Sequence, residues 1–122
     1  MSRQDRAPWF PFYPADWLSD PKVAALTWAS QGRYIGLLAS MWEHGAEGCR
    51  IPRRTAEKLY GTAFVAAIAD GPHALITAYI DDAGSTWLHS DRLFQEAQLC
   101  KSRSDAAREA ARIRWSERNA TA

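Results

Sequence analysis

The sequence contains no long apolar run and very little cysteine. Although 47% of its 122 residues are hydrophobic, none of its apolar stretches approaches the ~18 residues that a membrane span requires. We therefore expect a soluble protein that does not contact a membrane. Cys49 and Cys100 are the only cysteines, and because their spacing fits neither a metal site nor a redox motif, we expect two reduced thiols. The N-terminus also lacks the apolar stretch of a secretory signal, which favours the cytoplasm.

Motifs of catalysis are missing as well. Glu43-His44 lacks the second His, one helical turn away, that a zinc-protease motif needs. His89-Ser90-Asp91 has the residue types of a catalytic triad only as neighbours in sequence, whereas such triads are assembled across a fold. No glycine-rich loop is followed by the Lys-Ser/Thr pair of a phosphate-binding loop. We expect no enzymatic activity, no cofactor, no metal and no small-molecule substrate.

The net charge is small but unevenly placed. It is +1 for the whole chain, which argues against a surface that attracts nucleic acid over its whole extent. Residues 1–99 carry nine Lys/Arg and eleven Asp/Glu, whereas residues 100–122 carry six and three. Because a chain of this length suits one hydrophobic core, we expect one domain over 1–99 and a basic, Ala/Arg-rich helical tail over 100–122.

Eight of the fourteen aromatic residues lie between residues 8 and 42. Each can bury roughly 150–250 Å², so we expect most of them to anchor the core, although the segment could also present a surface to a partner. Pro8, Pro11 and Pro14 fix φ and remove backbone donors, so the start of the segment should be an extended strap across the core. The eight aromatics are Trp9, Phe10, Phe12, Tyr13, Trp17, Trp28, Tyr34 and Trp42.

Two helix starts follow the strap. Asp20 as N-cap and Pro21 at the first helical position predict a short helix as far as Leu26. Thr27 can cap a longer helix that ends near Gly45. The expected buried face of this longer helix has three- and four-residue spacing and consists of Tyr34, Ile35, Leu38, Met41 and Trp42.

The second half of the chain predicts two more short helices and a hairpin. An extended link over 49–52 leads to helices over 53–60 and 62–69, which Gly61 separates and of which Thr62 can cap the second. Strands over 75–80 and 86–89 flank a turn over 81–85. The Asp81-Asp82 pair of this turn could alternatively bind a cation.

A last helix should begin at Ser90 or Asp91 and place Leu93, Phe94 and Ala97 in the core. Three helices followed by a hairpin indicate a mainly α, winged helix-turn-helix-like domain with a long C-terminal helix. In this fold one helix and the hairpin wing commonly approach DNA.

A cationic cluster lies in front of and within the helix expected over 53–60. It consists of Arg50, Arg53, Arg54 and Lys58 and is opposed locally only by Glu57. Positive charge at a helix N-terminus is unfavourable to the helix dipole, so an external anion such as a DNA phosphate is one explanation. A solvated helix start is the other.

The tail carries its charges on two faces of a helix. It could be a basic arm that contacts phosphate or a solvated, Ala-rich helix. Trp115 stands alone among charges, as residues that anchor a base, a protein groove or a second copy often do, so we expect it to bind a partner. Lys101, Ser104, Arg108 and Arg112 share one face by helical spacing, and Arg103, Ala107, Ala110, Arg114 and Arg118 share another; Lys101, Arg103, Arg108, Arg112 and Arg114 are the candidate nucleic-acid contacts.

Several segments resemble the YdaU-like family of phage and prophage proteins over about residues 9–115. They are FYPADWLSD, LTWASQGRYIGLLASMWEHG, the Ile-Pro link before the helix that ends at Gly61, DRLFQEA and KSRSDAAREAARIRW. Thr27 replaces the usual cap Ser, and Ser30 replaces the Glu of a capping box, which weakens the cap. Asp16, Trp17, Leu18, Leu26, Gly32, Tyr34, Leu37, Leu38, Trp42, Arg114 and Trp115 stand at matching positions.

The resemblance implies a winged-helix-like domain from a phage and a role in initiating or organising replication in the cytoplasm of a bacterial host. Two functions are therefore open. The first is a DNA-binding protein of the replication-organiser type that holds double-stranded DNA through the helix-turn-helix and the basic tail, with a host or phage replication protein as a further partner. The second is a phage-encoded adaptor or inhibitor that binds a host helicase, loader or defence complex without DNA.

Overall fold

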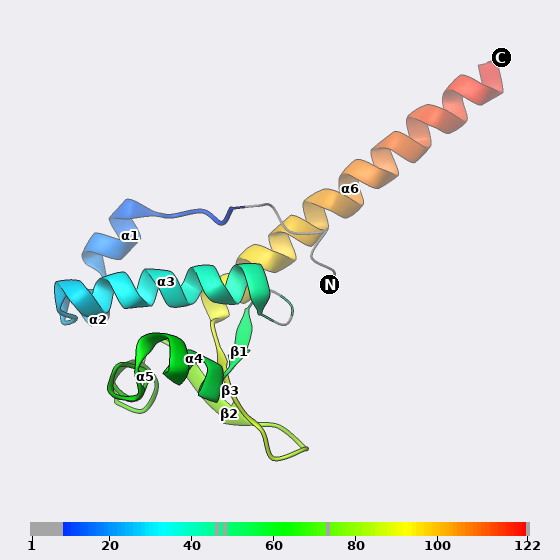
Figure 1. Ribbon diagram of the computed structural model, residues 1–122. Coiled ribbons are helices and arrows are strands. Elements are labelled where there is room, and N and C mark those ends of the chain that lie inside the picture. Colours follow the sequence, from blue (N-terminus) through cyan, green and yellow to red (C-terminus); the bar gives the residue numbers. More distant parts are fainter. Residues whose placement is uncertain (1–8, 46, 48, 73, 122) are drawn as a thin grey trace.

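The computed structural model describes residues 9–45, 47, 49–72 and 74–121. It contains six helices and three strands among these residues (Figure 1). In chain order they are α1 (Pro14–Ser19), α2 (Pro21–Ala24), α3 (Trp28–His44), β1 (Arg50–Pro52), α4 (Arg53–Tyr60), α5 (Thr62–Ala69), β2 (Thr77–Ile80), β3 (Thr86–His89) and α6 (Asp91–Thr121).

The fold is the expected one, mainly helical with a small antiparallel sheet and a long C-terminal helix. The order α3, β1, α4, α5, β2, β3 is that of a winged helix-turn-helix. The expected extended link before α4 is a third strand, because β1 pairs with β3 and gives the sheet order β1-β3-β2. Ile51 lies opposite Leu88 in this pairing, so a buried pair connects β1 to the hairpin.

The core lies between α3, the helix-turn-helix and the sheet. Leu37, Leu38 and Met41 of α3 are fully buried, as is Leu93 of α6. Ile35 was expected in this core but is 39% exposed. The buried face of α3 instead includes Leu37, and Ile35 lies at the edge of this face. Phe94 is another wrong core assignment, since it is 40% exposed; its ring centroid lies 5.8 Å from that of His89.

Polar side chains cap three of the six described helices, α2, α3 and α6. The Asp20 side chain accepts from the Lys22 amide at 2.9 Å, and Thr27 Oγ1 accepts from the Ser30 amide at 3.1 Å. Ser90 Oγ accepts from Leu93 N at 3.2 Å and starts α6. The cap expected of Thr62 is wrong, because the chain bends at Gly61 with φ of +98° and Thr62 is already the first residue of α5.

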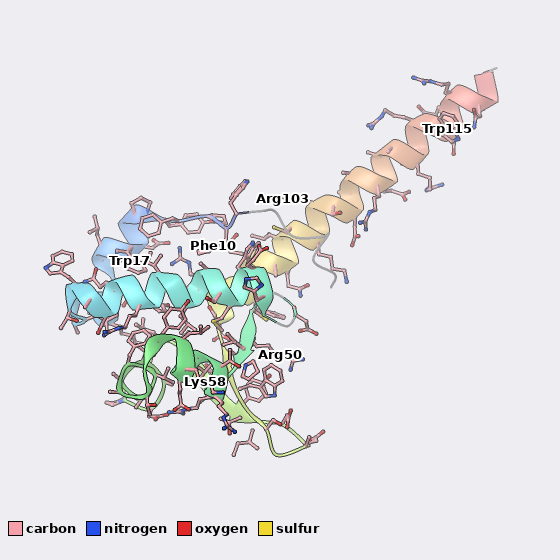
Figure 2. The ribbon with its side chains drawn as sticks, viewed as in Figure 1. Phe10, Trp17, Arg50, Lys58, Arg103 and Trp115 are labelled. Carbon is pink, nitrogen blue, oxygen red and sulfur yellow. The ribbon has the colours of Figure 1, made fainter. Side chains whose placement is uncertain are left out.

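The aromatic segment is only half buried. Its start is extended, but Pro14 occupies the first position of α1, a helix that the proline spacing did not predict. Phe10 packs on Trp42 with ring centroids 5.9 Å apart, and Trp17 stacks on Tyr34 at 5.6 Å (Figure 2). The expectation that most of these aromatics anchor the core is wrong for the other four, Trp9, Phe12, Tyr13 and Trp28, which are exposed.

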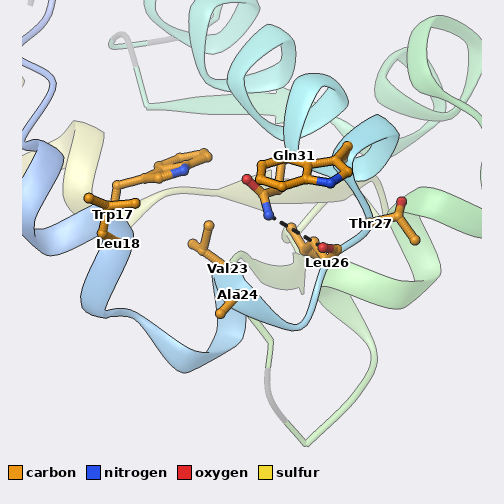
Figure 3. A pocket seen from close by; sticks show the side chains of 8 residues that line it. Trp17, Leu18, Val23, Ala24, Leu26, Thr27 and Gln31 are labelled. Atoms are coloured by element: carbon orange, nitrogen blue, oxygen red, sulfur yellow. Dashed lines mark hydrogen bonds between the residues drawn. The ribbon is translucent and has the colours of Figure 1, made fainter.

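Part of this exposed aromatic surface borders a groove of about 370 Å³ between α1, α2 and α3 (Figure 3). Trp17, Val23 and Leu26 line it. Leu18 and Trp28 also line it and are 81% and 87% exposed. We call this surface the aromatic groove.

The last helix leaves the domain after about three turns. Leu93 and Ala97 are buried and Cys100 is partly buried, whereas residues 101–120 are exposed apart from the partly buried Ser104. Figure 1 shows α6 projecting away from the domain. It runs without interruption across the boundary expected at 99/100. No helix in the described part of the chain is both long enough and apolar enough to cross a membrane.

Candidate nucleic-acid interface

In the cationic cluster predicted near α4, two side chains make polar contacts within the protein and two are exposed to solvent. Arg50 lies on β1, and Arg53, Arg54 and Lys58 lie on α4. Arg50 and Arg53 make contacts within the protein, whereas Arg54 and Lys58 point into solvent.

Arg50 holds the root of the wing. Its guanidinium lies 4.7 Å from the centre of the Trp87 ring and donates to the Tyr79 hydroxyl at 2.9 Å. Trp87 Nε1 in turn donates to Asp81 Oδ2 at 2.8 Å. Arg50 therefore ties β1 to β2 and β3, and only part of its surface is open to a ligand.

The acidic turn of the wing is built by Asp81. Its Oδ1 accepts from the amides of Ala83 and Ser85 at 3.0 and 2.8 Å, and Gly84 adopts φ of +84°. The hydrogen bond from Trp87, followed by that from the Ser85 amide, lowers the pKa of Asp81. These contacts support the turn-forming role of Asp81. Of the two explanations for the Asp81-Asp82 pair, a turn or a cation site, the turn is the simpler one.

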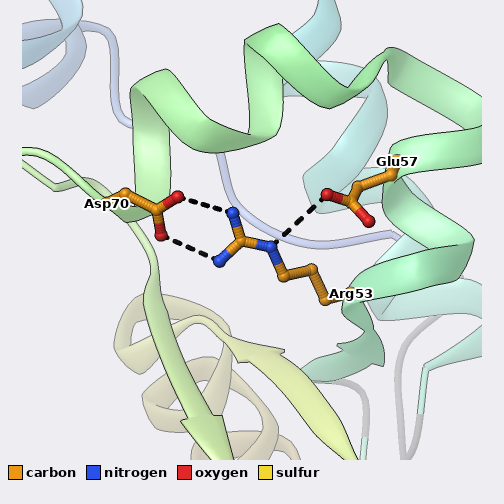
Figure 4. A network of polar contacts seen from close by, with 3 residues as sticks. All are labelled: Arg53, Glu57 and Asp70. Carbon is orange, nitrogen blue, oxygen red and sulfur yellow. Dashed lines mark hydrogen bonds and ion pairs between the residues drawn. The ribbon is translucent and has the colours of Figure 1, made fainter.

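Arg53 is neutralised inside the protein (Figure 4). Its Nη1 and Nη2 donate to the two carboxylate oxygens of Asp70 at 2.8 and 2.6 Å, and its Nε lies 3.5 Å from Glu57 Oε2. Besides Glu57, the acid nearest in sequence, the cluster is therefore opposed by Asp70, which is 17 positions away from Arg53. For Arg53, the anion near the N-terminus of α4 is Asp70, whose pKa the guanidinium lowers.

Asp70 directly follows α5, and the sequence contained a signal for this contact. The helices α4 and α5 have eight residues each and a single glycine between them. Two such helices can fold back on each other, so the end of α5 can approach the start of α4.

Arg54 and Lys58 are the accessible part of the cluster. They are one helical turn apart and therefore lie on the same side of α4. Within the described part of the chain, neither makes a hydrogen bond or an ion pair. Figure 2 shows Lys58 and Arg50 on the side of the molecule that carries the wing.

The second helix of the helix-turn-helix carries no charge. Phe64, Val65 and Ile68 of α5 are buried, and its exposed side chains are Thr62, Ala63 and Ala67. In helix-turn-helix proteins this helix reads base edges, mostly through Arg, Lys, Asn or Gln. Here only the Thr62 hydroxyl can form a hydrogen bond, so α5 is poorly suited to base recognition.

The remaining predicted contacts lie on the projecting part of α6. Lys101, Arg103 and Arg114 are exposed and form no ion pair or hydrogen bond with a described residue. Arg108 is paired with Asp105 at 3.5 Å, and Arg112 donates to both oxygens of Glu109 at 3.1 and 2.5 Å. Trp115 is 62% exposed.

The predicted cations thus form two separate surfaces. Figure 2 shows Arg103 and Trp115 on α6, well away from Arg50 and Lys58. A single small ligand cannot contact both surfaces, whereas an extended polymer can.

The triad residue types at 89–91 do not form a catalytic site. Ser90 is buried and its hydroxyl oxygen caps α6, while His89 Nδ1 contacts Asp91 Oδ1 at 3.1 Å. Across the described residues, no three His, Cys, Asp or Glu side chains are placed to hold a metal ion. His73 lies outside the described residues.

Comparison with known proteins gives no relative. No protein-family model, no curated protein and no solved structure matches the chain. The function is therefore inferred from the surfaces described above.

Proposed function

We propose that this protein binds double-stranded DNA through the phosphate backbone. The supporting observation is a set of exposed cations on two helices of a winged-helix domain. Among the described residues, none of these cations has a carboxylate partner. They are Arg54 and Lys58 on α4 and Lys101, Arg103 and Arg114 on α6. Lys and Arg side chains of this kind supply most of the non-specific affinity for DNA.

The placement of Arg54 and Lys58 fits a backbone contact. In a helix-turn-helix the first helix crosses the phosphate backbone while the second enters the groove. The first helix, α4, carries these two cations, whereas α5 exposes mainly methyl groups. The domain therefore contacts phosphates and contributes little base recognition through α5.

The resemblance to the YdaU-like family supports a more specific role. It rests on the aromatic entry at Asp16, Trp17 and Leu18 and on the closing Arg114-Trp115. We place the protein on this basis in the cytoplasm of a phage-infected or lysogenic bacterium, where it binds DNA to initiate or organise replication.

Fluorescence anisotropy with a labelled duplex of about 30 base pairs over a salt series tests the DNA-binding function. For four to six phosphate contacts we expect a log–log slope near −0.9 per contact, that is about −4 to −5. The double variant Arg54→Ala, Lys58→Ala should lower the affinity about tenfold and reduce the slope by about 2.

A matched control removes two exposed cations elsewhere, in Lys22→Ala, Arg33→Ala. This control loses the same net charge and should keep most of the affinity. Absence of binding by the wild-type protein at low salt would refute the DNA-binding function.

The aromatic groove favours a second function, the protein-binding adaptor. Leu18 and Trp28 are the most exposed large apolar residues named above, and apolar surface of this kind marks protein contacts. A pull-down with the purified replicative helicase or loader of the host tests it. Binding that survives 0.5 M salt and is lost in Leu18→Ser, Trp28→Ser would support the adaptor, and equal recovery of both proteins would contradict it.

A further inference from the structure

The charges on the projecting part of α6 are sorted around the helix axis. Successive residues of an α-helix are turned by about 100°. The side of α6 that packs on the domain through Leu93, Ala97 and Cys100 therefore continues past the domain through the line of Ser104, Ala107, Ala111 and Trp115. We call these four residues the ridge.

Five of the six cations beyond Cys100 flank the ridge, and the sixth, Arg118, lies on the line of the ridge beyond Trp115. At about 100° per residue, each lies within about 100° of its centre, whereas the three acids lie at about 120° or more. The flanking cations are Lys101, Arg108 and Arg112 on one side and Arg103 and Arg114 on the other; the acids on the far side are Asp105, Glu109 and Glu117.

The ion pairs of α6 agree with this arrangement. Arg108 reaches Asp105 and Arg112 reaches Glu109 over three residues, from one flank round to the far side. Both pairs are exposed, and exposed pairs contribute little to stability. These arginines can therefore exchange their carboxylates for phosphates at small cost.

This geometry matches one ligand in particular. The major groove of duplex DNA is about 12 Å wide and accepts a helix of about 10–12 Å diameter, with phosphates along both edges. A helix in that groove needs cations on both flanks, small side chains where it approaches the base edges closely, and acids on the side turned away from the bases. The projecting part of α6 has flank cations on both sides, small side chains at Ser104, Ala107 and Ala111, and its acids away from the ridge.

We propose that α6 lies in the major groove of duplex DNA, with the ridge toward the bases and one cationic flank toward each phosphate wall. This inference rests on the DNA-binding function proposed above and makes α6, in place of α5, the helix that enters the groove. Ala107 and Ala111 allow a close approach to the base edges. Trp115 ends the ridge and offers them an apolar ring and one N–H donor.

A second copy of the chain fits this face poorly. Pairing two ridges would bring the cationic flanks of both helices together while the acids of both remain on the far sides. An acidic protein helix has the required charge, but the pattern of two cationic edges around small residues favours the groove. The acidic partner is therefore one of the outcomes that the test distinguishes.

The test uses the full chain and two labelled duplexes of identical sequence. In one, every cytosine is replaced by glucosylated 5-hydroxymethylcytosine, which fills the major groove. We expect the wild-type protein to bind the ordinary duplex at least tenfold more tightly, and saturation of the minor groove with netropsin to change the affinity less than threefold. Equal affinity for both duplexes overturns the proposal for α6, whereas absence of binding to either refutes the DNA-binding function itself.

Two double variants with the same change in net charge distinguish the effect of the flank cations from the effect of net charge alone. Arg103→Gln, Arg114→Gln removes two flank cations, and Ser102→Glu, Ser116→Glu adds two charges on the far side, where both serines are exposed. Circular dichroism at 222 nm verifies that both remain helical. The flank variant should lose at least tenfold in affinity and the far-side variant less than threefold; equal losses, or tighter binding of a poly-glutamate helix than of DNA, would overturn the proposal.

Discussion

The hydroxyl of Tyr13 donates a hydrogen bond of 2.9 Å to the carboxylate of Glu96, joining the strap to α6 across 83 positions of sequence. Arg92 adds to this connection, because its Nη2 donates to the Pro11 carbonyl at 3.3 Å and its guanidinium lies 5.6 Å from the centre of the Tyr13 ring. Glu96 is buried, so Tyr13 satisfies a carboxylate that water reaches poorly. The strap is therefore joined to the first turns of α6 through Tyr13 and Arg92.

Replacing Tyr13 by Phe should lower the urea midpoint of unfolding. The variant keeps the ring but leaves the buried carboxylate of Glu96 without its donor, and an unsatisfied buried group is destabilising. Tryptophan fluorescence at pH 7 measures the midpoint, with an unchanged m-value expected. A midpoint equal to that of the wild-type protein would show that Tyr13 does not hold Glu96 in solution.

Stability should decrease at alkaline pH because of Tyr34. Burial against Trp17 and the core raises its pKa above the ordinary value of 10.0. The folded protein binds this proton more tightly than the unfolded chain, so the stabilisation is complete below pH 10.0 and is lost as the pH rises through the folded pKa. Urea unfolding at pH 8 and pH 11 should show the loss, and Tyr34→Phe should make the two midpoints more similar. An equally steep decline in the variant would contradict this assignment.

Acid should remove the contribution of the Arg53–Asp70 pair. The guanidinium lowers the pKa of Asp70 below its ordinary value of 3.8. Stabilisation by the pair is therefore present above pH 3.8 and is lost as the pH falls through the folded pKa. Asp70→Asn should reduce the melting temperature more at pH 7 than at pH 2.5, whereas Asp82→Asn on the exposed wing should change neither. A deficit in Asp70→Asn of the same size at both pH values would speak against the ion pair.

Replacing Gly32 of α3 and Gly45 at the end of α3 by alanine should change the free energy of unfolding in opposite directions. A Cβ atom at Gly45 would collide with the carbonyl oxygens of Met41 and Arg50, whereas a Cβ at Gly32 meets nothing within 4 Å. We expect Gly45→Ala to destabilise the fold by about 1–3 kcal/mol and Gly32→Ala to stabilise it by roughly 0.5–1 kcal/mol, because alanine is the better helix former. Thermal unfolding of both variants measures the difference, and an undiminished stability of the Gly45→Ala protein would contradict the close approach of Gly45 to the carbonyls of Met41 and Arg50.

Leu38 and Ile35 should differ strongly although both belong to the apolar pattern of α3. Leu38 is 1% exposed and Ile35 is 39% exposed. Leu38→Ala should cost about 2–5 kcal/mol of unfolding free energy, and Ile35→Ala about 1 kcal/mol or less. Chemical denaturation of the two variants measures these values. Equal losses would place Ile35 in the core after all.

The local signals in the sequence predicted the elements well. Asp20, Thr27 and Gly61 mark helix boundaries through hydrogen bonds or backbone angles that involve only neighbouring residues. Contacts over long sequence distances were not accessible in this way. The pairing of β1 with β3 and the contact of Arg53 with Asp70 depend on how the elements pack, as does the exposure of Trp28.

For the candidate site, too, the local features could be predicted from the sequence and the long-range contacts could not. Spacing alone placed the tail cations on two faces of a helix, and the structure shows this helix continuous with the core-packed turns at Leu93 and Ala97. Spacing could not show that Arg50 has a partner inside the protein, because Tyr79 is 29 positions away. For Arg53, the two eight-residue helices joined at Gly61 indicate that the end of α5 can approach the start of α4, but they do not identify Asp70 as the partner.

The continuity of α6 ties the rotational setting of its distal end to the core. The helix cannot rotate about its axis without removing Leu93 from the core. Every residue as far as Trp115 therefore has a fixed angular position around the helix axis relative to the domain. Two residues inserted after Lys101 would rotate the distal part by about 200° and turn its acids toward the side on which the ridge now lies, whereas seven would restore the setting to within about 20° and move it outward by about 10 Å. Insertions in this helix should therefore preserve DNA binding when their length is close to a whole number of helical turns, as seven or eleven residues are, and disrupt it when they add about half a turn.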